Sequence, residues 1–83
     1  MDKVMITGGQ LRAGRAYAKI SAVKLAELAD VGRSTIVKAE STDGIPPITA
    51  NNLSLIQRTL ESLGVIFGVN GEVNYKPPLE KEG

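Results

Sequence analysis

Residues 25–41 read LAELADVGRSTIVKAES, two short amphipathic patterns with almost no chain between them. Apolar residues recur at helical spacing from Leu25 to Ala29, and a second apolar face begins with Ile36 and Ala39. A connection this short forces two helices to cross steeply, as they do in a helix-turn-helix motif. An αα-hairpin inside a small helical core is the alternative interpretation of the same segment.

The composition narrows the possible functions. The chain has 83 residues, enough for one small domain, and contains neither Cys nor His. Disulfides, thiolate metal sites and the commonest general base are therefore excluded, and the remaining carboxylates and hydroxyls form no catalytic pattern. We expect no enzyme, no metal site and no cofactor. Without a membrane-length apolar run or a signal-peptide pattern, we also expect a cytoplasmic protein with no membrane partner.

Charge is distributed unevenly along the chain. Residues 1–38 hold seven basic and three acidic residues, whereas residues 39–83 hold three basic and six acidic ones, and the formal net charge is +1. A polarised molecule can present a basic face to phosphate despite a nearly neutral total. The charge pattern is therefore compatible with a nucleic-acid partner but does not by itself indicate one.

Four helices are predicted from capping residues and from a helical period of apolar residues. Thr7 and Gln10 have the spacing of a capping box, and Ser21 and Thr49 are typical N-cap residues. Gly64 stands where a left-handed residue often ends a helix. The predicted helices span residues 8–18, 22–29, 33 to about 40, and 50–63.

After the fourth predicted helix, the apolar period changes to two. Residues 65–76 read VIFGVNGEVNYK, and the central Asn-Gly is a strong signal for a β-hairpin with a two-residue turn. That turn pairs Ile66 with Tyr75 and places Val65 and Phe67 on the opposite face of the hairpin. We expect the face of Ile66 and Tyr75 to cover the helices.

The hairpin suggests a contact with a second copy. A lone hairpin leaves its outer edges unpaired, and an exposed edge beside an apolar stripe invites a partner. We therefore predict a dimer interface at Val65, Phe67 and Val69; the alternative is a hairpin that only covers a monomer's core. The expected organisation is a helix-turn-helix domain over 1–64, a dimerisation element over 65–76 and a disordered tail over 77–83.

From Gln10 to Leu63 the sequence resembles the Cro/phage-repressor class of helix-turn-helix domains, the XRE family. The resemblance is carried, in order, by Gln10-Leu11-Arg12 with Arg15, Leu25-Ala26-Glu27-Leu28-Ala29, Val31-Gly32-Arg33-Ser34-Thr35-Ile36, Glu40, and Leu53-Ser54-Leu55-Ile56 with Leu60 and Gly64-Val65. Asp30 replaces the usual turn Gly, Gly32 the usual Ser or Thr cap, and Ser41 a common Asn or Arg. The resemblance implies a mainly α fold, a small bundle of about four helices, here followed by a C-terminal β-hairpin.

The resemblance also implies where DNA is bound. The helix that starts at Arg33 matches the recognition helix, and Arg reads guanine through O6 and N7 together. A structural ion pair between Arg15 and Glu40 is implied as well. The implied base-reading residues are Arg33, Ser34, Thr35, Val37 and Lys38. The implied phosphate contacts are Ser21, Ala22, Ser41, Thr49, Asn51 and Asn52.

These observations lead to a functional hypothesis. We expect a nucleoid-associated bacterial or phage transcriptional regulator that binds double-stranded DNA in a sequence-specific way. It would act as a homodimeric repressor of its own promoter, on an inverted-repeat operator. The alternative is an antitoxin, in which the same DNA-binding domain carries a hairpin or tail that docks a toxin protein.

Overall fold

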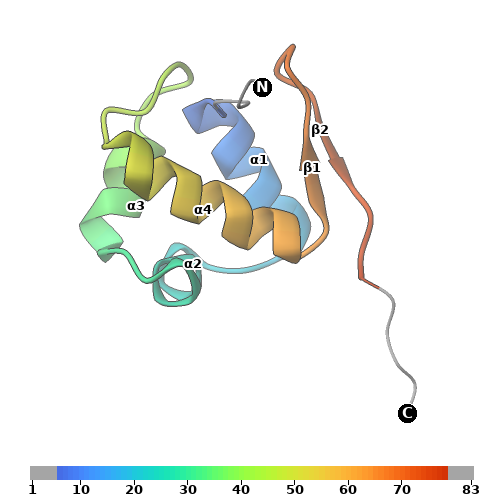
Figure 1. The fold of residues 1–83 in the computed structure, drawn as a ribbon, viewed down its shortest axis with the longest axis horizontal. Coiled ribbons are helices and arrows are strands. Elements are labelled where there is room, and N and C mark those ends of the chain that lie inside the picture. The colour runs from blue at the N-terminus through green and yellow to red at the C-terminus, as the bar shows by residue number, and fades with distance from the viewer. Residues whose placement is uncertain (1–5, 79–83) are drawn as a thin grey trace.

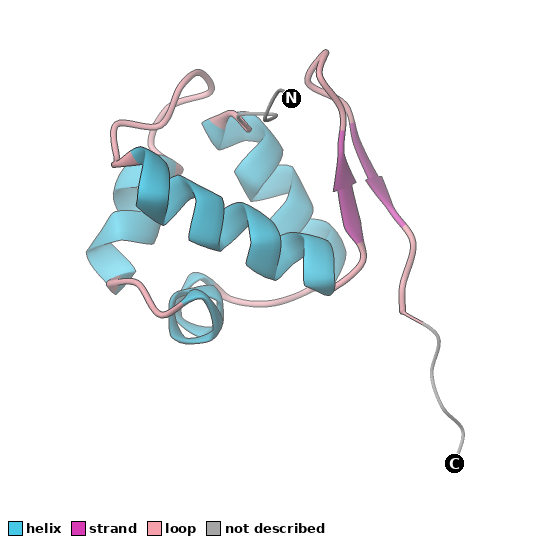
Figure 2. Cartoon of the chain, viewed as in Figure 1, coloured by secondary structure: helices cyan, strands magenta, loops and turns pink. Residues whose placement is uncertain are grey.

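The computed structural model describes residues 6–78, which form four helices followed by a two-stranded antiparallel hairpin (Figure 1). The elements are α1 (Gly8–Ala18), α2 (Ala22–Ala29), α3 (Arg33–Ala39), α4 (Ala50–Ser62), β1 (Val65–Phe67) and β2 (Val73–Tyr75). The predicted fold class, mainly helical with a C-terminal hairpin, is confirmed (Figure 2). The tail predicted over 77–83 lies outside the described residues from position 79 onward.

Helices α1, α2 and α4 begin where a side chain satisfies one of their first backbone N–H groups, whereas α3 begins at Gly32 without a side-chain cap. The Thr7 hydroxyl accepts from the Gln10 N–H at 3.1 Å, while the Gln10 side-chain oxygen accepts from the Thr7 N–H at 2.9 Å. The predicted capping box is therefore confirmed. The hydroxyls of Ser21 and Thr49 cap α2 and α4 by accepting from backbone N–H groups at 3.0 and 3.1 Å.

The ends of the first two helices use left-handed residues. Asp30 ends α2 with φ 60°, as its place in the predicted turn requires. Lys19 ends α1 in the same conformation, with φ 58°, which the sequence did not indicate. Gly64 follows α4 with φ +106°, and a Cβ there would meet the Lys76 carbonyl oxygen at 2.4 Å. Only glycine fits this junction between α4 and β1.

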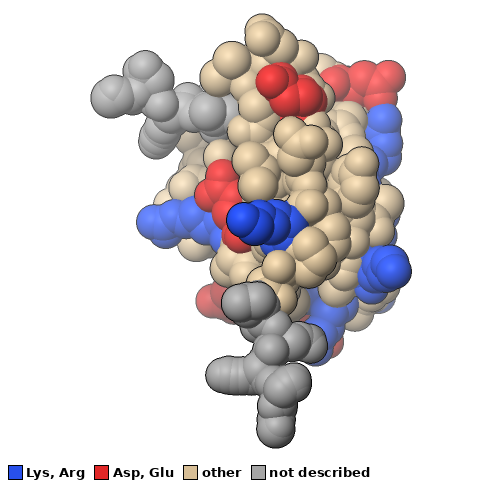
Figure 3. All heavy atoms as spheres, turned by 90° about the vertical axis from the view of Figure 1, so that its right-hand side faces the viewer, with Lys and Arg blue, Asp and Glu red and all other residues tan. Residues whose placement is uncertain are grey.

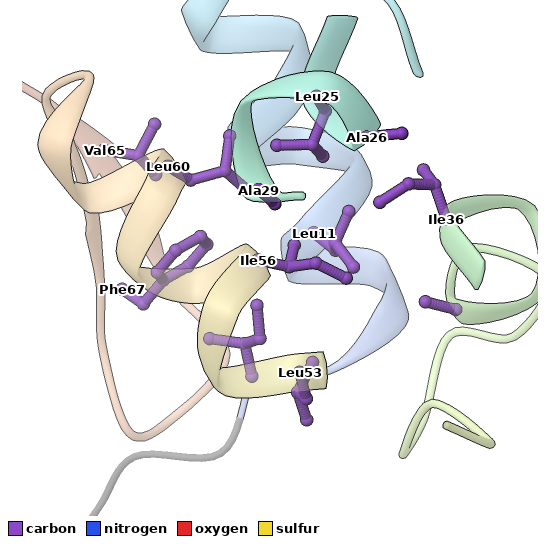
Figure 4. Close-up of a cluster of buried hydrophobic side chains, with 12 residues drawn as sticks. Leu11, Leu25, Ala26, Ala29, Ile36, Leu53, Ile56, Leu60, Val65 and Phe67 are labelled. Atoms are coloured by element: carbon purple, nitrogen blue, oxygen red, sulfur yellow. The ribbon is translucent and has the colours of Figure 1, made fainter. Parts of the chain in front are cut away.

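A single core joins all four helices and the hairpin (Figure 4). Side chains from α1, α2, α3 and α4 converge on it, and its fully buried members include Leu11, Leu25, Ile36, Ile56 and Leu60. Figure 4 shows that Val65 and Phe67 reach this cluster from the hairpin side. The hairpin is therefore part of the domain's core and not an appendage.

The predicted register of the hairpin is wrong by one residue. Val65 pairs with Tyr75 and Phe67 with Val73, because the turn is a three-residue loop, residues 69–71, closed by a bond from the Gly68 N–H to the Glu72 carbonyl at 2.9 Å. The third loop residue, Gly71, has φ +88°, which is the left-handed position that such loops require. The Asn-Gly signal is real, but it marks a longer loop than predicted.

The shift moves the residues of β1 to the opposite face but leaves those of β2 on the predicted one, so Val73 and Tyr75 still pack toward the helices. Val65 and Phe67 point into the core, with 1% and 8% of their surface exposed, and a Cβ on Gly14 would come within 3.0 Å of the Phe67 ring. The prediction that they form an outward apolar stripe is therefore wrong. Ile66 is the outward residue instead, at 49% exposure, and Val69 lies exposed in the loop.

A buried amide fastens the hairpin to α1. The Gln10 side chain is 4% exposed, and its Nε2 donates to the carbonyl oxygens of Gly68 at 3.0 Å and Glu72 at 3.2 Å. The same side chain closes the capping box at Thr7. Gln10 thus joins the start of α1 to both ends of the hairpin loop.

Candidate nucleic-acid interface

The exposed face of α3 is the central feature of the candidate site. Ile36 and Ala39 are fully buried against the core, as predicted, so the opposite side of this short helix must face solvent. Arg33, Ser34 and Lys38 are exposed there, with Val37 at 62% exposure. Four of the five predicted base-reading residues therefore share an open face, and the fifth, Thr35, is half-buried.

Two hollows open on the exposed face of α3. The first, of about 420 Å³, lies between α3 and the start of α4. The second, of about 640 Å³, lies on the exposed face of α3 itself and reaches Ser41 just after the helix. The DNA major groove is wide enough to admit an exposed helix such as this one. The first hollow is lined by Ser34, Thr35, Lys38, Pro47, Ile48, Thr49 and Asn52, and the second by Arg33, Ser34, Val37, Lys38 and Ser41.

The residues predicted to contact phosphate differ in whether they line a hollow beside α3. Thr49 and Asn52 line the first hollow beside Lys38, so they lie next to the face of α3. Asn51 is exposed but lines neither hollow. Ser41 lines the second hollow, yet its hydroxyl donates to the Lys38 carbonyl at 2.7 Å. Because that hydroxyl has only one hydrogen to donate, Ser41 is poorly suited to hold a phosphate oxygen.

Ser21 and Ala22 lie at the start of α2. The Ser21 hydroxyl oxygen accepts from the Lys24 N–H, and its hydrogen can still donate to a phosphate oxygen. Ala22 can contribute only its backbone N–H at the first helical position. Neither residue lines the hollows beside α3.

The predicted ion pair between Arg15 and Glu40 is present, and it ties α1 to the end of α3. Arg15 Nε and Nη2 donate to the two carboxylate oxygens at 2.7 and 2.9 Å, and Nη1 donates to the Ile20 carbonyl at 3.1 Å. The hydrogen bonds to Glu40 raise the pKa of Arg15, with its negative charge adding to the effect and partial burial opposing it. This bidentate geometry fixes the C-terminal end of α3.

A second arginine on α1, Arg12, holds the same end of α3, a role that the sequence did not reveal. Its Nη1 donates to the carbonyl oxygens of Glu40 at 2.9 Å and Thr42 at 3.2 Å, and its Nη2 contacts the Asp43 carboxylate. A cation at a helix C-terminus also opposes the partial negative charge there. The spacing of Arg12 and Arg15 could have indicated this role, because residues three apart lie on the same side of a helix and can reach the same neighbouring segment.

The first turn of α1 packs directly against the segment after α3. The Gly8 N–H donates to the Gly44 carbonyl at 2.8 Å, and a Cβ on Gly8 would lie 1.9 Å from the Thr42 carbonyl oxygen. Pro47 and Ile48 form a wall of the first hollow, which the sequence did not indicate either. Both features depend on how the loop after α3 folds back, which no local pattern encodes.

Metal-binding and membrane-spanning features are both absent from residues 6–78. No group of three His, Cys, Asp or Glu side chains comes together there in a way that could hold a metal ion. Within the same range, none of the helices combines the length and the apolar character that crossing a membrane requires.

Comparison of the chain with protein-family models, with curated proteins and with solved structures finds no match. The resemblance to the Cro/phage-repressor class therefore stays a prediction from the residues themselves.

Proposed function

We propose that the protein binds double-stranded DNA in a sequence-specific way and regulates transcription, with α3 in the major groove. The observation that carries this proposal is the exposed face of α3, where Arg33, Ser34 and Lys38 lie open to solvent and line a hollow of about 640 Å³. These side chains are the types that hydrogen-bond to base edges, and Val37 can contact a thymine methyl group. The buried side of α3 and its clamped C-terminal end hold this face in one orientation.

Contacts to the DNA backbone would come from the starts of α4 and α2. Thr49 and Asn52 at the start of α4 flank the first hollow, and Ser21 and Ala22 open α2. N–H groups at helix starts favour phosphate, and such contacts set the register of a protein on the duplex. A single module of this size buries little DNA surface, so we infer that two copies act together on an inverted repeat.

The antitoxin alternative uses the same DNA-binding face and differs only in a further protein partner. Sequencing the neighbouring gene separates the two functions, because an antitoxin is encoded beside its toxin. The exposed face of α3 supports DNA binding in both cases, and the homodimeric repressor is the leading proposal because it needs no further protein partner.

The proposal is tested by selecting preferred duplexes from a random pool with the full-length protein. Arg33→Ala should weaken binding to the selected site by about 1–3 kcal/mol and relax the preference at one base pair per half-site. Binding to a scrambled duplex should change much less. The measurement is a titration of both duplexes at several salt concentrations, because phosphate contacts make affinity depend on salt.

Arg58→Ala is the matched control, because Arg58 is an exposed arginine of α4 that lines neither hollow. It removes the same charge but should leave the sequence preference unchanged. A parent protein that prefers no duplex over a scrambled one contradicts the proposal. Equal losses on both duplexes for Arg33→Ala would instead make Arg33 a phosphate contact.

A further inference from the structure

The tip of the hairpin holds two neighbouring residues that can react with each other, Asn70 and Gly71. Both are exposed in the loop between β1 and β2. The tip stands at the top of the molecule in Figure 1 and in Figure 3, which faces the hairpin side. The side-chain amide carbon of an asparagine is an electrophile, and the backbone nitrogen of the next residue can reach it to close a five-membered ring. Glycine favours this approach because it has no Cβ.

The groups that would react are not held by other parts of the domain. Within residues 6–78, no hydrogen bond engages the Gly71 N–H or the side-chain amide of Asn70. A Cβ on Gly71 would find nothing within 4 Å beyond the adjoining residues, so no other segment packs over the reacting nitrogen. The one contact at this point is from the Asn70 backbone N–H to the Glu72 carboxylate, at 2.8 Å.

We propose that Asn70 is a site of spontaneous modification, at which the folded chain converts this asparagine to aspartate and isoaspartate. The Gly71 nitrogen attacks Asn70 Cγ, so that a bond from this nitrogen to Cγ forms and the bond from Cγ to Nδ2 breaks. The amide group leaves as ammonia, taking the proton of the Gly71 nitrogen, and a succinimide ring remains. Water then opens the ring. Attack at Cγ gives aspartate, whereas attack at the main-chain carbonyl carbon gives isoaspartate.

The pair Asp43-Gly44 has the same spacing, but the structure protects it. The Gly44 N–H donates to the Thr42 hydroxyl oxygen at 3.1 Å, so the nitrogen that would attack is engaged. The Asp43 carboxylate is paired with Arg12, and an ionised carboxylate is a poor electrophile. The Gly44 carbonyl is held as well, by the Gly8 N–H at 2.8 Å. Only the hairpin pair therefore has a free nitrogen beside an uncharged amide.

The other asparagines provide controls within the same chain. Asn51 and Asn52 lie in the first turn of α4, and the N–H groups of the residues that follow them both donate to Thr49, at 3.1 and 3.0 Å. Asn74 is paired in the hairpin and is followed by Tyr75, whose side chain would crowd the ring. These positions should react much more slowly than Asn70.

The two products would affect the hairpin differently. Both add a negative charge close to Glu72, which repels it. Isoaspartate also lengthens the main chain by a carbon atom inside the loop. The loop is closed by the bond from the Gly68 N–H to the Glu72 carbonyl at 2.9 Å, and the Gln10 amide bridges the carbonyls of the same two residues. A longer loop changes the span between these carbonyls and weakens the attachment of the hairpin to α1.

The reaction is tested by incubating the full-length protein at physiological temperature and analysing its peptides by mass spectrometry. Asn70 should exchange the mass of NH₂ for that of OH at least about tenfold faster than Asn51, Asn52 or Asn74. An isoaspartate-specific methylation assay should label the loop peptide but not the peptide that contains Asp43. In urea the Asp43 peptide should become labelled too, while the rate at Asn70 stays within about threefold of the folded rate.

Two glycine variants separate the proposed chemistry from a general effect of the loop. Gly71→Ala should slow the conversion of Asn70 about tenfold, in the folded chain and in urea, because the added Cβ crowds the ring. Gly44→Ala is the matched control and should leave the rate at Asn70 unchanged. The effect on the hairpin is measured on isoaspartate protein separated by anion exchange. It should melt below the Asn70→Asp variant, which has the same charge without the longer chain.

Four results would overturn the inference. Conversion at Asn70 no faster than at the other asparagines, or about tenfold slower in the folded chain than in urea, would show that the folded loop prevents the attack. Equal rates for Gly71→Ala and the parent would exclude the ring. Equal melting temperatures for isoaspartate protein and Asn70→Asp would refute the effect on the hairpin. None of these measurements involves DNA, so the inference stands or falls independently of the proposed function.

Discussion

The two ends of the molecule differ in which groups they leave exposed. At the α3 end, the exposed surface of the helix presents side chains such as Arg33 and Lys38, and these determine which partner can bind there. At the β2 end, backbone groups of Val73 and Tyr75 point away from β1, and a strand offers the same pattern to any other strand. Exposed side chains therefore suit the selection of one particular molecule, whereas a strand edge is less selective.

Helix α1 supports both ends, but by different physical means. Toward α3 it presents Arg12 and Arg15, whose hydrogen bonds to carbonyl and carboxylate oxygens carry charge. Toward the hairpin it presents Gln10, Gly14 and Tyr17, which act through a neutral amide and close packing. The stability of the two ends should therefore respond differently to substitutions on α1 and in the segments it holds.

The largest expected effect separates α1 from the end of α3. Gly8→Ala places a Cβ 1.9 Å from the Thr42 carbonyl oxygen and 2.7 Å from that of Ala39, both backbone atoms that cannot rotate away. We expect a loss of about 3 kcal/mol in the free energy of unfolding, measured by urea denaturation. Gly9→Ala is the control, because its Cβ would have no neighbour closer than 3.6 Å.

Gly9→Ala should stabilise the protein slightly, because Ala favours a helix over Gly by up to about 1 kcal/mol. Similar urea midpoints for the two alanine variants would show that α1 does not need close contact with the segment after α3. The contrast between the two ends would then lose its structural basis on the α3 side.

The next effect tests the charged clamp. Glu40→Ala removes two hydrogen bonds from Arg15, whose side chain is 26% exposed, and should cost about 2 kcal/mol in thermal unfolding. Asp43→Ala breaks the pair with Arg12, but the Asp43 side chain is 87% exposed, so the loss should stay below about 1 kcal/mol. Equal melting temperatures for the two variants would contradict the view that the partly buried pair carries the clamp.

The smallest effect belongs to the hairpin loop. Gly71 has φ +88°, and a Cβ there would have no atom within 4 Å, so Gly71→Ala meets only the conformational cost, about 1 kcal/mol. Gly44→Ala, in an exposed loop without positive φ, should change stability by less than about 0.5 kcal/mol. Indistinguishable unfolding curves for these variants would mean that the loop tolerates a register different from the one described.

The helices and the turn between α2 and α3 were predictable because their signals are local. The caps at Thr7, Ser21 and Thr49 and the left-handed Asp30 all act within a few residues of the position they define. The exposed face of α3 followed from the burial of Ile36 on its other side. The exposed face of α3 is therefore the part of the candidate site that could be predicted from the sequence.

The face of β1 was not predictable from the same kind of signal. An Asn-Gly pair fits a two-residue turn and a three-residue loop equally well, and a slip of one residue between the strands moves every side chain of one strand to the other face. The close fit of Phe67 against Gly14 decides between the registers, and it depends on α1. The bond from Arg12 to the Thr42 carbonyl likewise joins segments that only the folded chain brings together.

The amide of Gln10 also bears on the order of events during folding. It bonds to carbonyl groups that lie 58 and 62 residues further along the chain, so almost the whole domain must be closed into a loop before these bonds form. Contacts between neighbouring helices close much shorter loops and can form earlier. We therefore expect the hairpin to dock last and to detach first, with its amide hydrogens exchanging with solvent sooner than those of the helical core. The hairpin would therefore be the last part of the domain to form during folding.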